Sequence, residues 1–256
     1  MPPYMLLKDD TWRVDRRRFY YRFPVRTYRL PEQFARSHHQ EESVLSVAMH
    51  SDFLIVVAAL LLREALGHGM MLDPPNRASR WRFNASAPAD YDDNQCYCGG
   101  AGNQYGVNGG KCGVCGDPYQ EPHPQAHENT GKYGEGVVVA EYASGSTIDV
   151  TIKLTANHLG HFEYSVCPLE DPDSPEPGED CFRPLILADG TSQYPVLKEQ
   201  FDIKNTIKLP EMECDRCVLR WHYTAGNSWG QCEDGTYAEG CGPQETFRSC
   251  SDIAIH

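Results

Sequence analysis

The 256-residue chain has no hydrophobic run long enough to cross a bilayer and no cysteine before position 96. Its longest apolar run, Phe53 to Leu62, is ten residues, whereas a transmembrane helix needs about 20. A run of this length fits the apolar segment of a secretory signal peptide instead. The chain also lacks long amphipathic helical patterns and any regular alternation of strands with helices, which argues against all-helical and α/β folds.

Basic residues are scarce beyond position 67. Of the 23 Lys and Arg residues, ten lie in residues 1–67, so the remainder holds 13 basic and 28 acidic residues, a formal charge of −15. Because phosphate contacts need clustered Lys and Arg, we expect no nucleic-acid partner. The remaining length of about 190 residues suits one domain with one core.

The first 67 residues differ in character from the rest. Residues 1–48 are basic and aromatic, and three interpretations stay open: an extension of the reading frame upstream of a working start at Met49, a long basic region of the signal, or a cytosolic tail on a signal anchor. We favour the first, because a signal is read near the N-terminus. Residues 49–67 are then a signal peptide, with small residues at Ala65 and Gly67. Cleavage would secrete residues 68–256, free of the membrane and beginning at His68.

All eleven cysteines lie at or after Cys96. The pairs Cys96-x-Cys98 and Cys112-x-x-Cys115 bracket a glycine-rich loop. In a cytosolic protein this spacing would suggest a zinc knuckle, but behind a secretory signal we favour disulfides. The odd count leaves one thiol free or paired between chains. Asn84-Ala85-Ser86 is a glycosylation sequon, which also fits a secreted protein.

Short strands separated by turns dominate the second half of the chain. Residues 70–132 are rich in Pro and Gly and are expected to be mostly loop. Strands are expected from alternating or β-branched patterns at 136–142, 147–154, 161–166, 201–209, 217–223 and 251–255. This arrangement predicts an all-β fold, an immunoglobulin/fibronectin-III-like antiparallel β-sandwich with long disulfide-braced loops.

Two histidines could form a metal site. His158 lies in the corner between two expected strands, and the sandwich can bring it beside a mature N-terminus at His68. The His68 amine, the His68 ring and the His158 ring would supply three nitrogens, an arrangement that suits copper. Asn157 and His161 could orient these ligands.

Several stretches together resemble a known family. They are His68-Gly69, Pro74 to Arg82, Cys96-x-Cys98-Gly99-Gly100, Gly110 to Asp117, Thr155-Ala156-Asn157-His158-x-Gly160, Gly226 to Gly230 and Cys241 to Ile253. They cover nearly all of residues 68–255. The chain resembles the lytic polysaccharide monooxygenases of auxiliary-activity family 15, which are related to chitin-binding type-4 domains.

The resemblance implies a histidine brace, in which copper is held by His68 and His158. It places Phe247 beside the axial position and Ala156 near the copper, where its methyl group would limit access. Gln244 or Glu245 could orient a bound oxygen species. On the flat end of the sandwich, Trp81, Tyr97 and Tyr105 are candidates for stacking on sugar rings.

The implied reaction is copper-dependent oxidation of an insoluble β-1,4-linked polysaccharide. An external reductant or redox partner reduces the copper, and O2 or H2O2 is the co-substrate, with attack at C1 or C4 of the sugar. We expect a secreted monomer acting on crystalline chitin in preference to cellulose. Two alternatives stay open: a carbohydrate-binding domain without redox activity, and a zinc-bound disulfide scaffold.

Overall fold

The computed structural model describes residues 68–256. The expected signal peptide at 49–67 and the segment 1–48 lie outside these described residues. The elements of the described part are β1 (His68–Asp73), η1 (Arg80–Arg82), η2 (Gly102–Val107), β2 (Ala140–Tyr142), β3 (Thr147–Ala156), β4 (His161–Pro168), η3 (Glu179–Cys181), β5 (Arg183–Leu187), β6 (Tyr194–Pro195), β7 (Asp202–Lys208), β8 (Cys214–Thr224), β9 (Trp229–Gln231), β10 (Tyr237–Glu239) and β11 (Thr246–Ile255).

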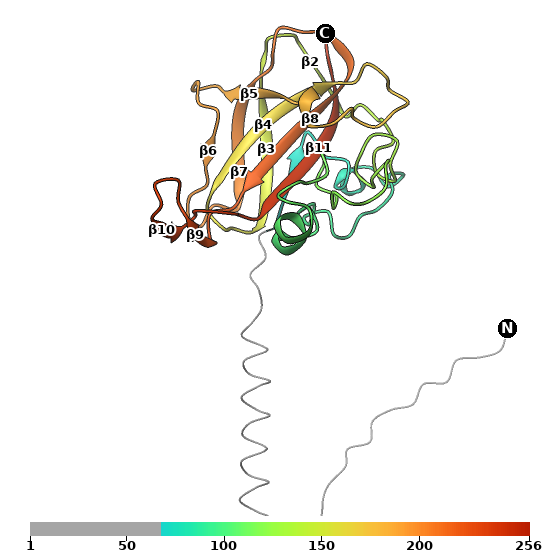
Figure 1. Ribbon diagram of the computed structural model, residues 1–256. Helices are drawn as coiled ribbons and strands as arrows, with labels where there is room; N and C mark the ends of the chain where they lie inside the picture. The colour runs from blue at the N-terminus through green and yellow to red at the C-terminus, as the bar shows by residue number, and fades with distance from the viewer. Residues whose placement is uncertain (1–67) are drawn as a thin grey trace, which may run out of the picture. The chain divides into compact units, whose positions relative to one another are not determined.

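These strands form the expected β-sandwich (Figure 1). The strand order is β1-β3-β7-β5-β4-β8-β11-β2, and β6 pairs with β4. Strand β5 pairs with both β7 and β4, so it links the two layers. All pairs are antiparallel except β2 with β11, which is parallel. Strands β9 and β10 form a separate hairpin. Among residues 68–256, no helix has the length and hydropathy needed to span a bilayer.

Alternating side chains explain why the predicted strands form. On β3, the side chains of Ile148, Val150, Ile152 and Leu154 are buried while their neighbours are more exposed. Each such side chain contributes roughly 1.5–3 kcal/mol through burial. They share one core with aromatic residues of β4, β8 and β11. Residues 70–132 are mostly loop, as expected, with only η1 and η2 as helical turns beyond the end of β1.

Five disulfides brace the loops. They are Cys98–Cys112, Cys115–Cys250, Cys167–Cys181, Cys214–Cys217 and Cys232–Cys241. Of the cysteines described, Cys96 alone is free, and it is buried. Three of the four cysteines that could have formed a zinc knuckle are therefore in disulfides. The Cys115–Cys250 bond ties the glycine-rich region to β11.

A buried ion network fastens the segment after β1 to β11. Arg77 donates to both oxygens of Asp252, at 2.9 and 2.6 Å, and to Glu176 at 2.6 Å. Burial alone would lower the pKa of Arg77, but the two carboxylates outweigh it and raise the pKa above its usual value. The guanidinium therefore remains charged and compensated inside the protein.

Replacing this arginine should destabilise the domain strongly. We expect Arg77→Met to lower the free energy of unfolding by about 3–5 kcal/mol, because it leaves two buried carboxylates without their cation. Chemical denaturation measures this loss. Arg183→Met, at an exposed position of β5, is the control and should change the value by less than about 1 kcal/mol. Equal effects of the two substitutions would contradict the expectation.

Candidate metal centre

His68 is placed by the pairing of β1 with β3. Its Cα partner is Ala156, the last residue of β3. The Gly69 N–H donates to the carbonyl oxygen of Asn94 at 3.1 Å, and the Asn94 side chain donates to Thr155 Oγ1 at 2.8 Å. These contacts fix the start of β1 beside the end of β3.

Glycine at position 69 lets β1 lie close to the core. A Cβ atom there would come within 2.6 Å of Leu154 Cδ2 and 2.9 Å of Trp221 Cη2. Both side chains are fully buried, so neither has room to retreat. Any larger residue would push the strand away, and His68 with it.

His158 lies two residues beyond the end of β3. Its backbone N–H donates to the hydroxyl of Tyr223 at 3.0 Å, and its carbonyl accepts from the Gly226 N–H at 2.8 Å. The turn continues through Gly160, which has a φ of 80° and lies against the backbone of Thr224. The His158 loop is therefore fixed on both sides by its own backbone bonds.

The His158 imidazole has the properties of a metal ligand. Burial lowers its pKa, and the charge of nearby His68 lowers it further, so the ring is neutral at physiological pH. Its Nδ1 atom is buried without a hydrogen-bond partner. The closest carboxylate oxygen, Glu245 Oε2, is 3.8 Å away, too far for a hydrogen bond. A neutral imidazole with an unshared ring nitrogen fits a transition metal such as copper.

His68 and His158 are the two histidines that the fold brings together here. Within residues 68–256, no three His, Cys, Asp or Glu side chains gather where they could hold one ion. A metal held by these two histidines would have two side-chain ligands, and in a chain that begins at His68 the α-amine would be available as a further nitrogen.

Phe247 lies behind His68. It is fully buried, and its ring centroid is 6.3 Å from that of His68, at 48°. The ring also stacks on Tyr223 at 5.6 Å and on Tyr97 at 6.2 Å. Tyr97 is thus partly buried and packed against the core, which limits its ring for stacking on sugar.

The other two aromatic candidates also make internal contacts. The Tyr105 hydroxyl donates to the carbonyl oxygen of Gln244 at 2.9 Å. Trp81 meets Tyr91 edge to face at 5.3 Å, with Arg82 over its ring at 4.8 Å. Tyr91 itself is 81% exposed, so this pair presents an aromatic surface to solvent.

Gln244 and Glu245 have different surroundings. The side-chain oxygen of Gln244 accepts from the Ser228 N–H at 3.0 Å. The side-chain amide nitrogen of Gln244 donates to the backbone carbonyl oxygens of Ser228 and Cys241 at 3.1 and 2.7 Å. Gln244 therefore fastens the base of the β9–β10 hairpin. Glu245 is 7% exposed and lies beside the His158 ring. Of the two, Glu245 is the one whose carboxylate lies near His158.

The sequence did not single out the aromatic residues of the β9–β10 hairpin. Trp229 is 71% and Tyr237 is 61% exposed. The hairpin follows Gly226, whose N–H is bonded to His158, and Leu159, next to His158, is also exposed. An apolar surface therefore adjoins the metal centre. The one sequence feature that could have indicated an exposed tryptophan is the setting of Trp229, which lies between polar residues and glycine.

Comparison with known proteins identifies the class. The family described as "Lytic polysaccharide mono-oxygenase, cellulose-degrading" matches residues 68–253. The chain therefore belongs to the lytic polysaccharide monooxygenases, and it is a copper-dependent enzyme that cleaves polysaccharide by oxidation.

A solved structure gives the subgroup. It is the lytic polysaccharide monooxygenase AA15 from Thermobia domestica in the Cu(I) state, with 42% identity over 73% of this chain and 98% of that one, and a TM-score of 0.71. Within the class, the chain belongs to auxiliary-activity family 15. The cellulose-active CelS2 (ScLPMO10C) in complex with copper is more distant, at 18% identity over the same shares and a TM-score of 0.39. No curated protein matches the chain.

Proposed function

We propose that the enzyme is a secreted monomer that oxidatively cleaves chitin in preference to cellulose, with one copper ion held by a histidine brace of His68 and His158. The observation that carries the site is the buried, neutral ring of His158, with an unpartnered nitrogen, beside the first residue of β1. A catalytically inert binding domain would have no need for this pair.

Cleavage after Gly67 is part of the proposal. The family match begins at His68, and Ala65 and Gly67 suit a signal-peptidase site. Secretion also agrees with the five disulfides. Asn84 is exposed, so its sequon would be accessible to glycosylation.

The chain's own residues would shape the reaction. When bound, copper supplies one-electron redox chemistry: with an external reductant and O2 or H2O2 it would give an oxidant that can attack C–H bonds. Phe247 would exclude water and further ligands from the side of the site that its ring covers, because this ring has no metal-binding atom. Ala156, the Cα partner of His68, would limit access to the copper with its methyl group. Glu245 would accept a hydrogen bond from a protonated oxygen species beside His158.

The surface around the centre suits a neutral, flat polymer. Trp229 and Tyr237 offer exposed rings for stacking on sugar faces. The acidic mature chain would repel an anionic polymer. Leu159 adjoins His158 and is 39% exposed, so it could contact an acetamide methyl group, which chitin has and cellulose lacks.

An assay on both polymers tests the substrate. Copper-loaded protein beginning at His68, supplied with ascorbate, should release oxidised oligosaccharides faster from insoluble chitin than from cellulose, as measured by mass spectrometry. The metal-free protein is the control and should release none. Oxidised products from cellulose alone would refute the chitin preference, and products with only native ends would indicate a contaminating hydrolase.

A further inference from the structure

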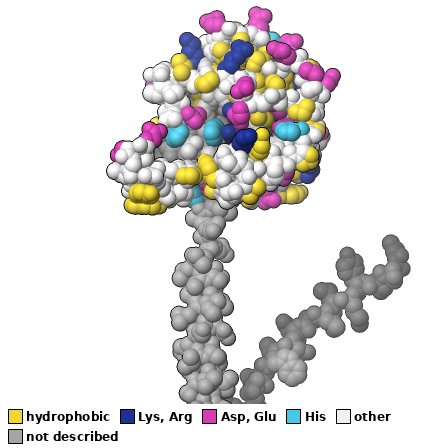
Figure 2. Space-filling view, viewed as in Figure 1, with side chains coloured by type: hydrophobic (Ala, Val, Ile, Leu, Met, Phe, Trp, Pro, Cys, Tyr) yellow, Lys and Arg dark blue, Asp and Glu magenta, His cyan; other side chains and the backbone are white. Residues whose placement is uncertain are grey.

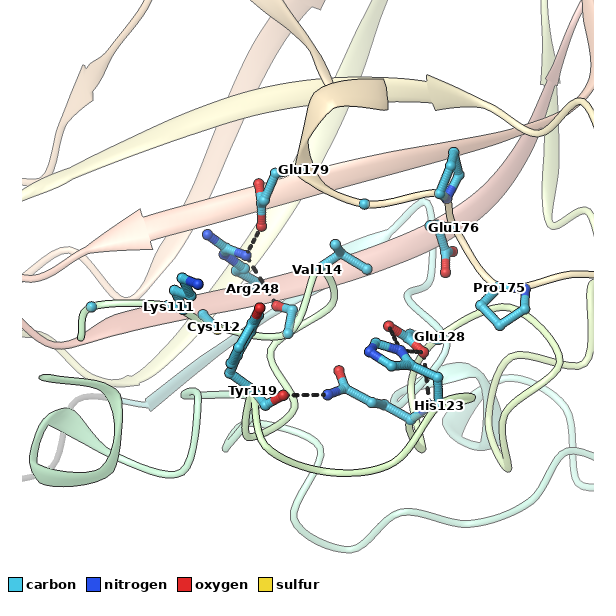
Figure 3. A pocket seen from close by; sticks show the side chains of 15 residues that line it. Lys111, Cys112, Val114, Tyr119, His123, Glu128, Pro175, Glu176, Glu179 and Arg248 are labelled. Atoms are coloured by element: carbon cyan, nitrogen blue, oxygen red, sulfur yellow. Dashed lines mark hydrogen bonds and ion pairs between the residues drawn. The ribbon is translucent and has the colours of Figure 1, made fainter. Parts of the chain in front are cut away.

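A pocket of about 810 Å³ opens on the flank of the sandwich and contributes nothing to the proposed metal centre. Its walls are residues 110–114 and 119–128, the loop 175–179, and Arg248 of β11. Figure 3 shows Lys111 and Arg248 at one end and His123 and Glu128 at the other. Figure 2 shows separate histidine and basic side chains, with acidic ones among them, across the middle of the molecule in this view. The volume lies in the range of small-molecule sites.

Positive charge is in excess at one end of the pocket. Glu179 is the carboxylate that pairs with both Arg248 and Arg220, the latter at 2.9 Å. Lys111 has no ion pair among the described residues; its Nζ lies 5.1 Å from the centre of the Tyr119 ring. Burial and the nearby charge of Arg248 lower the pKa of Arg220 to about 10. Among the lining residues of this end, the single carboxylate of Glu179 therefore faces two cations, Lys111 and Arg248, and it is shared with Arg220 outside the lining.

The other carboxylates of the pocket are already in use. Glu176 is fully buried against Arg77 and accepts the Asn129 N–H at 2.9 Å. Glu128 accepts the Gln125 N–H at 2.8 Å and contacts the His123 ring. Neither can offset the cationic end, so that end remains attractive to an anion.

Two buried polar atoms of the pocket residues have no partner. They are the Nε of Arg248, a donor, and the Oε1 of Gln125, an acceptor. Gln125 is 1% exposed. A buried polar atom without a hydrogen bond is unfavourable. After a small shift of these two side chains, which are closed to solvent, a ligand that accepts at Arg248 and donates to Gln125 would relieve this cost.

An aromatic side chain of the pocket, Tyr119, can pack against a sugar ring. Tyr119 is 43% exposed, and its ring lies under Lys111. Aromatic faces of this kind pack against the C–H face of sugars as they pack against other apolar surfaces. We propose that the pocket binds a sugar acid: a saccharide ring whose carboxylate lies at Lys111 and Arg248 and whose hydroxyls reach Gln125. The proposal is independent of the metal centre.

Calorimetric titration of the secreted, copper-loaded protein tests the pocket, with glucuronate as the probe. Glucose, which lacks the charge, and sulfate, which lacks the ring, are the comparison ligands. We expect glucuronate to bind at least about tenfold more tightly than either, since a charge-assisted hydrogen bond contributes about 1.5–3 kcal/mol. Absence of glucuronate binding at millimolar concentration, or equal binding of glucose or sulfate, would overturn the proposal.

Variants then locate the site. Lys111→Glu should weaken glucuronate binding at least about tenfold, whereas Lys208→Glu, at an exposed position on β7, should leave it unchanged. Tyr119→Leu should weaken glucuronate while leaving the weaker sulfate affinity as it was. Thermal unfolding verifies that each variant is folded. If Lys111→Glu and Lys208→Glu bind glucuronate alike, the ligand lies elsewhere and the assignment fails.

Discussion

A protein that keeps an N-acetylated Gly67 ahead of His68 should bind Cu(II) at least about 100-fold more weakly than one that begins at His68. Loss of a hydrogen bond to a metal ligand alone costs 10–100-fold in affinity, and here a ligand itself is lost. In the longer protein the His68 nitrogen is an amide, and the acetyl group removes the Gly67 amine that would otherwise chelate Cu(II) together with this amide and the His68 ring, while both imidazoles are unchanged. The comparison therefore isolates the amine.

Competition with a copper chelator measures the affinities, and electron spin resonance reports the ligand set. A protein with one glycine added after His256 is the matched control, because it also carries one added glycine but has an intact His68 terminus. It should keep the affinity and the spectrum of the parent. If the protein with Gly67 binds copper as tightly and gives the same spectrum, the brace does not include the terminal amine.

The strands with clear side-chain alternation could be predicted from sequence. Residues 147–154 alternate strictly, and β3 forms there because only one face is buried. Strand β1 has no such pattern: Gly69, Met70 and Met71 are all buried. It was missed because its closeness to the core depends on Leu154 and Trp221, which are distant in sequence. Strands β5 and β6 and the β9–β10 hairpin are short, so their side chains show too little alternation for these strands to be predicted.

The two histidines could be selected from sequence, but their contact could not be derived from spacing. They lie 90 positions apart in the numbering, and they meet because His68 pairs with Ala156, two residues before His158. Register of this kind depends on the whole sheet. The flank pocket had no sequence signal at all, because loops 110–128 and 175–179 and Arg248 meet only in the fold. The disulfide partners were undetermined for the same reason.

His158→Ala should abolish the stabilisation that copper gives to the protein beginning at His68. A ligand present at 1,000 times its Kd stabilises the folded state by about 4 kcal/mol, and for a domain of this size each kcal/mol raises Tm by about 2–4 °C. The parent protein should therefore unfold roughly 8–16 °C higher with copper than without. The variant retains the amine and ring of His68 but loses the third nitrogen, so its shift should be small.

His256→Ala is the matched control. His256 follows β11 and is exposed, with a carboxylate oxygen of Glu141 at 3.7 Å. This variant should keep the full copper-dependent shift in Tm and the oxidative activity on chitin. Each variant is compared with its own metal-free form, which separates copper binding from any packing lost with the ring. A copper-dependent shift in His158→Ala equal to that of the parent would remove His158 from the metal centre, and with it the reason for the orphaned nitrogen found there.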